Sequence, residues 1–258
     1  NRVYVGNIKQ DGNTYPDRII RSPINFNGEP QHDTFPATHK MDVAANDGDA
    51  IVTLEGFGDR LLVFKKKAVY VLNVAQDGAE FVESRFVDIG VQNVCQVVNT
   101  EFGICWINDR GCYLFREGQP ENLIEGKLST FSGRDISPDM RWGISEARVP
   151  AVTYLPNSKK LIVAFGFDVS LSYTNDAWIY NFNRKSWAFG AGVVGSHVHK
   201  RSNFVTDNSG DALFAQLNNT ALTILKWADQ EQPHDEFNLF FKDLDFGQPN
   251  IRKKIYKA

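Results

Sequence analysis

The segment "GDRLLVFKKKAVYVLN", Gly58 to Asn73, contains two apolar runs separated by three consecutive lysines. Each run has the length of a β-strand, and neither shows the i, i+3, i+4 spacing of an amphipathic helix. The segment is therefore predicted to form a β-hairpin whose corner consists of Lys65, Lys66 and Lys67.

The same arrangement of apolar strand, polar corner and apolar strand recurs along the chain. It is present in "FGICWINDRGCYLFRE" (Phe102–Glu117) and in "GDALFAQLNNTALTILKW" (Gly210–Trp227). A more distant copy pairs Leu161–Phe165 with Ala177–Phe182 around a long insertion. A further strand-like segment, such as "AIVTLEGF" (Ala50–Phe57), precedes each copy, and successive copies start roughly 40 to 60 residues apart, which suits one four-stranded blade per repeat.

We therefore predict an all-β fold, a β-propeller with about four recognisable four-stranded blades and strand fragments at either end. The expected blades cover residues 50–92, 93–127, 148–192 and 195–230. The strands expected to be equivalent are Leu61–Phe64, Gly103–Ile107, Leu161–Phe165 and Leu213–Gln216. A β-sandwich would give similar alternation but would not explain a repeat at blade length.

Composition argues against two classes of function. The 28 Lys and Arg against 31 Asp and Glu give a net charge of −3, whereas a domain that grips nucleic acid through phosphates shows a basic excess. No apolar run approaches the ~20 residues that span a bilayer, and the first residues do not resemble a signal peptide, so no membrane insertion is expected. Cys95, Cys105 and Cys112 lack C-x-x-C spacing and are predicted to be small buried residues in a reducing compartment.

The lysine corner admits two interpretations. Lys65, Lys66 and Lys67 could contact phosphate, or they could solvate the end of a hairpin and discourage edge-to-edge pairing. At the corresponding corners of the other hairpins, "NDRG" carries charges of both signs and "LNNT" carries none, so a basic corner is not a shared feature of the repeats. We favour the solvated corner and expect that replacing all three lysines with Ser leaves folding intact and changes DNA affinity little.

Two other polar clusters could suggest metal binding. His197 and His199 would lie on one face of a strand, but no Asp, Glu or Cys has ligand spacing, and Lys200 and Arg201 would oppose a cation. The run Asp47–Asp49 hints at a calcium loop but lacks the further oxygen ligands and the closing Glu. It is predicted to be a turn that leads into a strand.

No catalytic motif stands out. "INDRGCYLF" is the nearest match to the Asp box of sialidase-type blades, with Tyr113 near the usual position of Trp. A glycosidase needs two carboxylates across a cleft, and no acidic pair differs from solvated turns. The sequence contains no G-x-S-x-G, Walker loop or H-E-x-x-H. We predict a non-enzymatic protein with no catalytic, cofactor-binding or metal-binding residues and no cofactor.

Long loops interrupt the repeat at residues 22–46 and 128–147, and both are candidates for subunit contacts. The second contains Ser137-Pro138-Asp139, a predicted N-cap and first turn of one short helix. Residues 1–234 are assigned to the propeller, and 235–258 to a closing strand and an exit toward a further domain of a longer polypeptide. Arg2–Ile8, Phe237–Phe246, or both, are expected to complete a blade with sequence far away in the chain, because isolated strands leave backbone groups unpaired.

Several strings together resemble the β-propeller region of tail nozzle, or tail adaptor and stabilisation, proteins of short-tailed bacteriophages, including crAss-like phages. The strings are "DRIIRSPINFNGEPQHDTFP" (Asp17–Pro36), "DGDAIVTLEGFGDRLLVFKKKAVYVLN" (Asp47–Asn73), "VVNTEFGICWINDRGCYLF" (Val97–Phe115) and "FKDLDFGQPNIRKKIYK" (Phe241–Lys257). The resemblance covers most of the chain and is weakest from Leu128 to His199.

The resemblance implies a non-enzymatic virion protein that forms a closed ring, usually of six copies, beneath the portal. Such a ring continues the DNA conduit, contacts other tail or portal-proximal proteins, and helps to retain the packaged genome. DNA would pass without sequence-specific binding, and the virion tail would assemble in the bacterial cytoplasm. The alternative is a carbohydrate-binding or carbohydrate-active propeller serving as a host-receptor module.

Overall fold

The computed structural model describes residues 2–24, 31–45, 47–76, 78–116, 118–130, 141–145, 149–165, 176–190, 193–194, 200–217 and 221–227. The chain divides into two compact units, Asn1–Trp227 and Ala228–Ala258, and the described residues all belong to the first. Within these ranges, no helix is long and apolar enough to cross a membrane.

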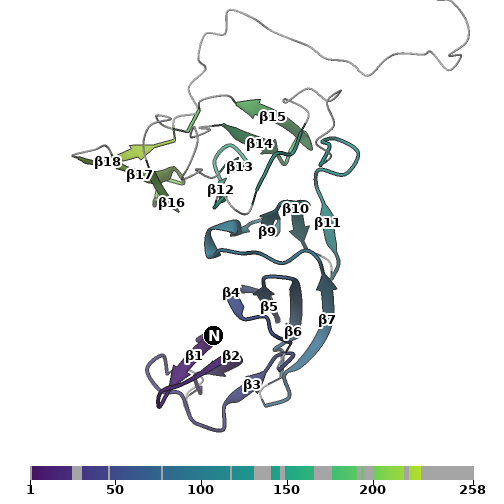
Figure 1. Ribbon diagram of the computed structural model, residues 1–258, viewed down its shortest axis with the longest axis vertical. Coiled ribbons are helices and arrows are strands. Elements are labelled where there is room, and N and C mark those ends of the chain that lie inside the picture. Colours follow the sequence, from purple (N-terminus) through teal and green to yellow (C-terminus); the bar gives the residue numbers. More distant parts are fainter. Residues whose placement is uncertain are drawn as a thin grey trace, which may run out of the picture. The chain divides into compact units, whose positions relative to one another are not determined.

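Three four-stranded antiparallel sheets form the middle of the first unit, and each follows the chain order of its strands (Figure 1). Sheet II contains β4 (Ile51–Phe57), β5 (Arg60–Lys65), β6 (Ala68–Asn73) and β7 (Phe81–Val87). Sheet III contains β8 (Val97–Thr100), β9 (Gly103–Asn108), β10 (Gly111–Phe115) and β11 (Pro120–Asn122), preceded by the 3₁₀ helix η1 (Val94–Gln96). Sheet IV contains β12 (Ala151–Leu155), β13 (Lys160–Ala164), β14 (Ala177–Asn181) and β15 (Ser186–Gly190).

A three-stranded antiparallel sheet lies at each end of this series. Sheet I contains β1 (Tyr4–Gln10), β2 (Asn13–Arg21) and β3 (Lys40–Asp42). Sheet V contains β16 (Lys200–Thr206), β17 (Ala212–Leu217) and β18 (Leu222–Lys226). The short strand β3 lies within the segment 22–46 that the sequence predicts to be a loop.

The predicted equivalence of four strands is confirmed. The expected segments correspond to β5, β9, β13 and β17, and each is the second strand of its sheet. The first strands of consecutive sheets also lie together: β1 is next to β4, β8 next to β12, and β12 next to β16. Four-stranded meanders in sequence, with neighbouring first strands, are the arrangement of β-propeller blades. The fold is all-β and of the β-propeller class.

The central strands of the middle sheets are buried on both faces, which explains why they are apolar without alternation. In β5, for example, Leu61 and Val63 face sheet I, whereas Leu62 and Phe64 face sheet III. The five sheets pack against one another in series through four clusters of buried apolar side chains, one at each junction between consecutive sheets. Their members include Ile19 with Val63 between sheets I and II, Phe64 with Trp106 between II and III, Ile107 with Val163 between III and IV, and Ala164 with Phe214 between IV and V.

Among the described residues, the N-terminal strand pairs with the next strand and not with distant sequence, so the closure prediction is not confirmed for Arg2–Ile8. β1 pairs with β2, the next strand in the chain, from Tyr4 opposite Arg21 to Gln10 opposite Asn13. The hairpin forms because Asp11 and Gly12 both adopt positive φ, 50° and 80°, which a tight two-residue turn requires. The N-terminal strand, which the sequence predicts to be an isolated fragment, therefore belongs to sheet I, a sheet in addition to the four expected blades. Phe237–Phe246 and the helix expected at Ser137-Pro138-Asp139 lie outside the described residues, and the boundary after residue 234 stays a prediction.

Candidate functional site

Lys65, the last residue of β5, is fully buried at the junction of sheets I and II. Its Nζ donates to Asp17 Oδ1 of β2 at 2.7 Å and to Asp47 Oδ1 at 2.9 Å. The prediction of a solvated corner is wrong for Lys65, because two carboxylates that precede it in the chain pair with its ammonium. Lys66 and Lys67 are exposed, as expected.

Asp47 and Gly48 form a bend shortly before β4, in line with the turn predicted for this run, and Asp49 also fixes the lysine corner. The Asp49 carboxylate accepts hydrogen bonds from the backbone N–H groups of Lys66, at 3.0 Å, and Lys67, at 2.8 Å. The Tyr70 hydroxyl donates to Asp47 Oδ2 at 3.3 Å. Among the described residues no group of three or more His, Cys, Asp or Glu side chains could hold a metal ion. These acidic residues bind protein groups, and sequence reasoning did not assign them that role.

The other side of the corner is closed by backbone. Val91 N–H donates to Lys65 O at 3.0 Å, and Asp88 N–H donates to Lys67 O at 2.7 Å. A Cβ on Gly90 would lie 2.3 Å from Lys65 O, so only glycine fits here. The corner is therefore fixed by contacts from segments on both sides of it in the sequence.

The charges of this cluster shift one another's pKa values. Burial raises the pKa of Asp47, but the hydrogen bonds from Lys65 and from the Asp49 backbone outweigh it, and the net pKa is below the ordinary 3.8. Burial lowers the pKa of Lys65, but hydrogen bonds to Asp17 and Asp47 outweigh it, and the net pKa is above 10.5. The Lys65–Asp47 ion pair is therefore intact at neutral pH.

We expect Asp47→Asn to lower the free energy of unfolding by about 1–2 kcal/mol at neutral pH, since a charged hydrogen bond is lost. A carboxylate with a depressed folded-state pKa stabilises above its unfolded pKa, and this contribution is lost as the pH falls through the folded pKa. The difference between wild type and variant should thus be constant at neutral pH and vanish below pH 3.8. Urea unfolding of both proteins from pH 2 to 8 measures it, and a difference that persists at the acid end would contradict the assignment.

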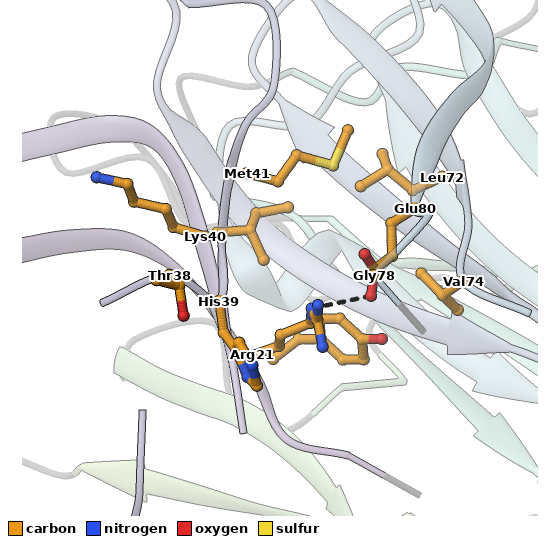
Figure 2. A pocket seen from close by; sticks show the side chains of 11 residues that line it. Arg21, Thr38, His39, Lys40, Met41, Leu72, Val74, Gly78 and Glu80 are labelled. Carbon is orange, nitrogen blue, oxygen red and sulfur yellow. Dashed lines mark ion pairs between the residues drawn. The ribbon is translucent and has the colours of Figure 1, made fainter. Parts of the chain in front are cut away.

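A cavity of about 210 Å³ lies beside the same junction, and Figure 2 shows the side chains around it. Arg21 Nε contacts Glu80 Oε1 at 2.8 Å, and both side chains are largely buried. Nδ1 of His39 is buried, and no described residue forms a hydrogen bond with it. Ile19 and Leu72 belong to the apolar part of the lining. Among the described residues that line the cavity, Glu80 alone is acidic, so these residues offer no pair of carboxylates of the kind that glycoside hydrolysis uses.

The stretch that most resembles an Asp box is a structural turn. Asn108 Oδ1 accepts from the backbone N–H groups of Arg110, at 2.9 Å, and Gly111, at 3.0 Å. Asn108 Nδ2 donates to Gly90 O at 3.1 Å, which joins sheet III to the segment after sheet II. Tyr113 is buried and stacks on Trp106, with ring centroids 5.4 Å apart.

Indole N–H groups make further contacts between segments that are distant in sequence. In each case the indole Nε1 donates to a backbone carbonyl oxygen. The pairs are Trp106 to Ile89 at 2.6 Å, Trp142 to Asn108 at 2.7 Å, Trp178 to Trp142 at 3.0 Å and Trp187 to Leu123 at 2.9 Å. Four of the five tryptophans therefore fix one sheet or connecting segment to another. The indole N–H groups of these four residues are therefore engaged in hydrogen bonds within the fold.

The cysteines are free, as predicted, and Cys105 and Cys112 are buried, while Cys95 is half-buried. Burial raises the pKa of Cys105 to about 12, so its thiol stays protonated at neutral pH. His197 and His199 lie outside the described residues.

Comparison with known proteins gives fold likeness alone. No protein-family model matches the chain, and no curated protein sequence matches it. The WD40 domain of SCAP from fission yeast is 8% identical, with 88% of this chain and 58% of that chain covered and a TM-score of 0.36. The N-terminal domain of Nup159 is 14% identical, with 82% and 69% covered and a TM-score of 0.31.

PorZ, a surface component of the type-IX secretion system of Porphyromonas gingivalis, is 12% identical, with 88% of this chain and 33% of that chain covered and a TM-score of 0.38. Such scores say nothing about activity or partners, and the assignment of the fold rests on the sheets of this chain. The chain is an all-β protein with consecutive blades of the β-propeller class.

Proposed function

We propose that this chain is a non-enzymatic structural protein of a short-tailed phage, which assembles with other copies into a ring that continues the DNA conduit of the tail. The observation that supports this most is the use of buried polar groups between sheets. Lys65 with Asp17 and Asp47, Asn108 with Gly90, and the indole groups all join one sheet or connecting segment to another. A wall component that bears force needs such contacts, whereas a catalyst needs polar groups free to meet a substrate.

The charge distribution fits passage of DNA rather than tight binding. The net charge is −3. In the run of three lysines, the charge of Lys65 is neutralised by ion pairs with Asp17 and Asp47. A surface that neutralises few phosphates releases few counterions and holds DNA weakly. DNA could therefore slide past such a wall.

Antibody labelling tests this function directly. Antibodies against the chain, applied to particles of the phage that encodes it and viewed by negative-stain electron microscopy, should label the tail just below the capsid. A matched serum against an unrelated propeller should leave particles unlabelled. Label that is absent from particles, or confined to the distal tail tip together with binding on a glycan array, would contradict the conduit role, and the second outcome would favour a receptor module.

The purified chain should show no hydrolysis of glycans, nucleic acid or peptides above a buffer blank. The reason is that the acidic side chains of the two described clusters are engaged by Lys65, Arg21 or backbone N–H groups. Turnover abolished by a single Asp or Glu substitution would overturn the non-enzymatic assignment.

A further inference from the structure

The cavity between sheets I and II is large enough to hold a small molecule. Its volume is about 210 Å³, whereas a cavity of about 150 Å³ already accommodates benzene. Strands of sheet I and the segment before β3 line one side, and β6 with the connection to β7 lines the other. The cavity therefore lies at an internal junction of the chain, and its size suits one six-membered ring with a substituent.

The charges in the cavity balance one another. Arg21 and Glu80 form an ion pair, and their side chains are only 13% and 12% exposed. Lys40 also belongs to the lining, but it is exposed, and Figure 2 shows its ammonium directed away from Glu80. Tyr4 and Thr38 add uncharged polar groups. An ion bound here would lose its hydration without gaining a counter-charge, so a neutral ligand fits better than an anion or a cation.

The cavity offers hydrogen-bonding groups of both kinds. Nδ1 of His39 is buried, and no described residue forms a hydrogen bond with it. A neutral imidazole can carry its proton on Nδ1 and donate from there. The Glu80 carboxylate has about four acceptor positions, and a single guanidinium group fills at most about two of them. A ligand that carries both an acceptor and an N–H donor would therefore match His39 and Glu80, and a buried polar atom such as Nδ1 calls for a partner of this kind.

The rest of the lining is apolar and rigid. Ile19 and Leu72 are buried in the cluster that joins sheets I and II, and Met41 and Val74 pack against that cluster. Small-molecule sites typically combine such apolar walls with a few polar groups that fix the orientation of the ligand. The polar end of a ligand would thus face Glu80 and His39, and its apolar part would contact the core.

We propose that this cavity binds a small neutral molecule in which a carboxamide group is attached to an apolar body about the size of an aromatic ring. The carboxamide N–H donates to Glu80, its carbonyl oxygen accepts from Nδ1–H of His39, and the apolar body contacts Leu72 and Val74. This binding site goes beyond the proposed conduit role, which does not use it, so either assignment can fail without the other.

Three ligands of the same shape and different charge test the proposal. Benzamide is neutral, benzoate is an anion and benzamidine is a cation at neutral pH. Each is titrated into the isotope-labelled 258-residue chain, and backbone amide NMR spectra report the site and the affinity. Benzamide should give saturable shifts confined to the segments that line the cavity, Thr38–Met41 and Leu72–Val74 among them. It should bind about 10-fold more tightly than either charged ligand, because only the neutral one matches the balanced charges.

Variants assign the contacts. Val74→Phe fills the cavity and should abolish the benzamide shifts, whereas the matched control Val87→Phe, at a residue of β7 that is 56% exposed, should bind as the wild type does. His39→Leu removes Nδ1 and should weaken benzamide binding about 3- to 10-fold, the value of one hydrogen bond. His39→Asn, which keeps a polar nitrogen near the same place, should recover part of that loss.

Circular dichroism melts establish that each variant is folded, and the comparison of the three ligands needs the wild type alone. The proposal is overturned if benzamide gives no saturable shifts, which would mean that water alone fills the cavity. Benzoate or benzamidine binding as tightly as benzamide would overturn the neutral ligand class. Benzamide shifts that survive Val74→Phe, or wild-type affinity in His39→Leu, would overturn the assigned contacts.

Discussion

Lys65→Ala is expected to lower the free energy of unfolding by about 3 kcal/mol. The substitution removes an ammonium that is fully buried and leaves Asp17 and Asp47, whose side chains are 12% and 26% exposed, without their cation. Breaking a buried ion pair by removing one partner costs about 3–5 kcal/mol, and the lower end applies because Asp47 keeps some contact with water. Urea unfolding followed by circular dichroism measures the change.

Lys66→Ala is the matched control, because Lys66 is the next residue and is exposed. It should change stability by no more than about 0.5 kcal/mol. Lys65→Met, which restores most of the volume but not the charge, should be nearly as unstable as Lys65→Ala. If both Lys65 variants unfold within 0.5 kcal/mol of wild type, Lys65 does not join sheets I and II as described.

Trp106→Ala should lower the free energy of unfolding by about 3–5 kcal/mol, the range for a large buried aromatic side chain. Trp106 is fully buried in the cluster between sheets II and III, and its ring is 5.3 Å from that of Phe64. Its indole N–H donates to Ile89 O at 2.6 Å. The substitution therefore leaves a cavity and also removes a hydrogen bond from sheet III to the segment that follows sheet II.

Trp106→Phe separates these two contributions, because it retains an aromatic ring and removes the N–H. It should cost less than Trp106→Ala but still about 1–3 kcal/mol, since the carbonyl of the half-buried Ile89 loses its donor. Phe81→Ala on the exposed surface of β7 serves as the control and should be near neutral. Equal stabilities for Trp106→Ala and Phe81→Ala, measured by thermal unfolding, would contradict the packing of these two sheets.

The sequence was sufficient to identify the central paired strands of sheets II, III and IV, but not the fourth strands β7 and β11. Their central strands are buried on both faces, so they appear as continuous apolar runs such as "LLVF" and "ICWIN", and the turns between them contain Asn, Asp and Gly. Because each sheet is a meander, pairing partners are neighbours in sequence and the hairpin repeat predicts the topology directly. Sheet I was harder, since β3 is three residues long and follows a long connection.

The chemistry of the sheet I–II junction could not be predicted in the same way. Lys65 lies in a run of three lysines, which is typical of a solvated corner, and its partners Asp17 and Asp47 are far from it in sequence. Arg21 and Glu80 likewise meet only because two sheets pack together. A single sequence has no periodicity that links such residues. The one local feature of the sequence that pointed to this junction was the acidic run Asp47–Asp49. In the structure, the Asp49 carboxylate accepts hydrogen bonds from the backbone of the lysine corner.

Single-particle electron microscopy of the intact polypeptide in its assembled state tests most directly the claim that these blades form the wall of a ring. The copies should be arranged around an open axis. Within each copy, four-stranded sheets should follow one another as blades, with the Lys65 ammonium between sheets I and II. A monomeric particle, or a map in which the strands form two sheets packed face to face, would contradict it.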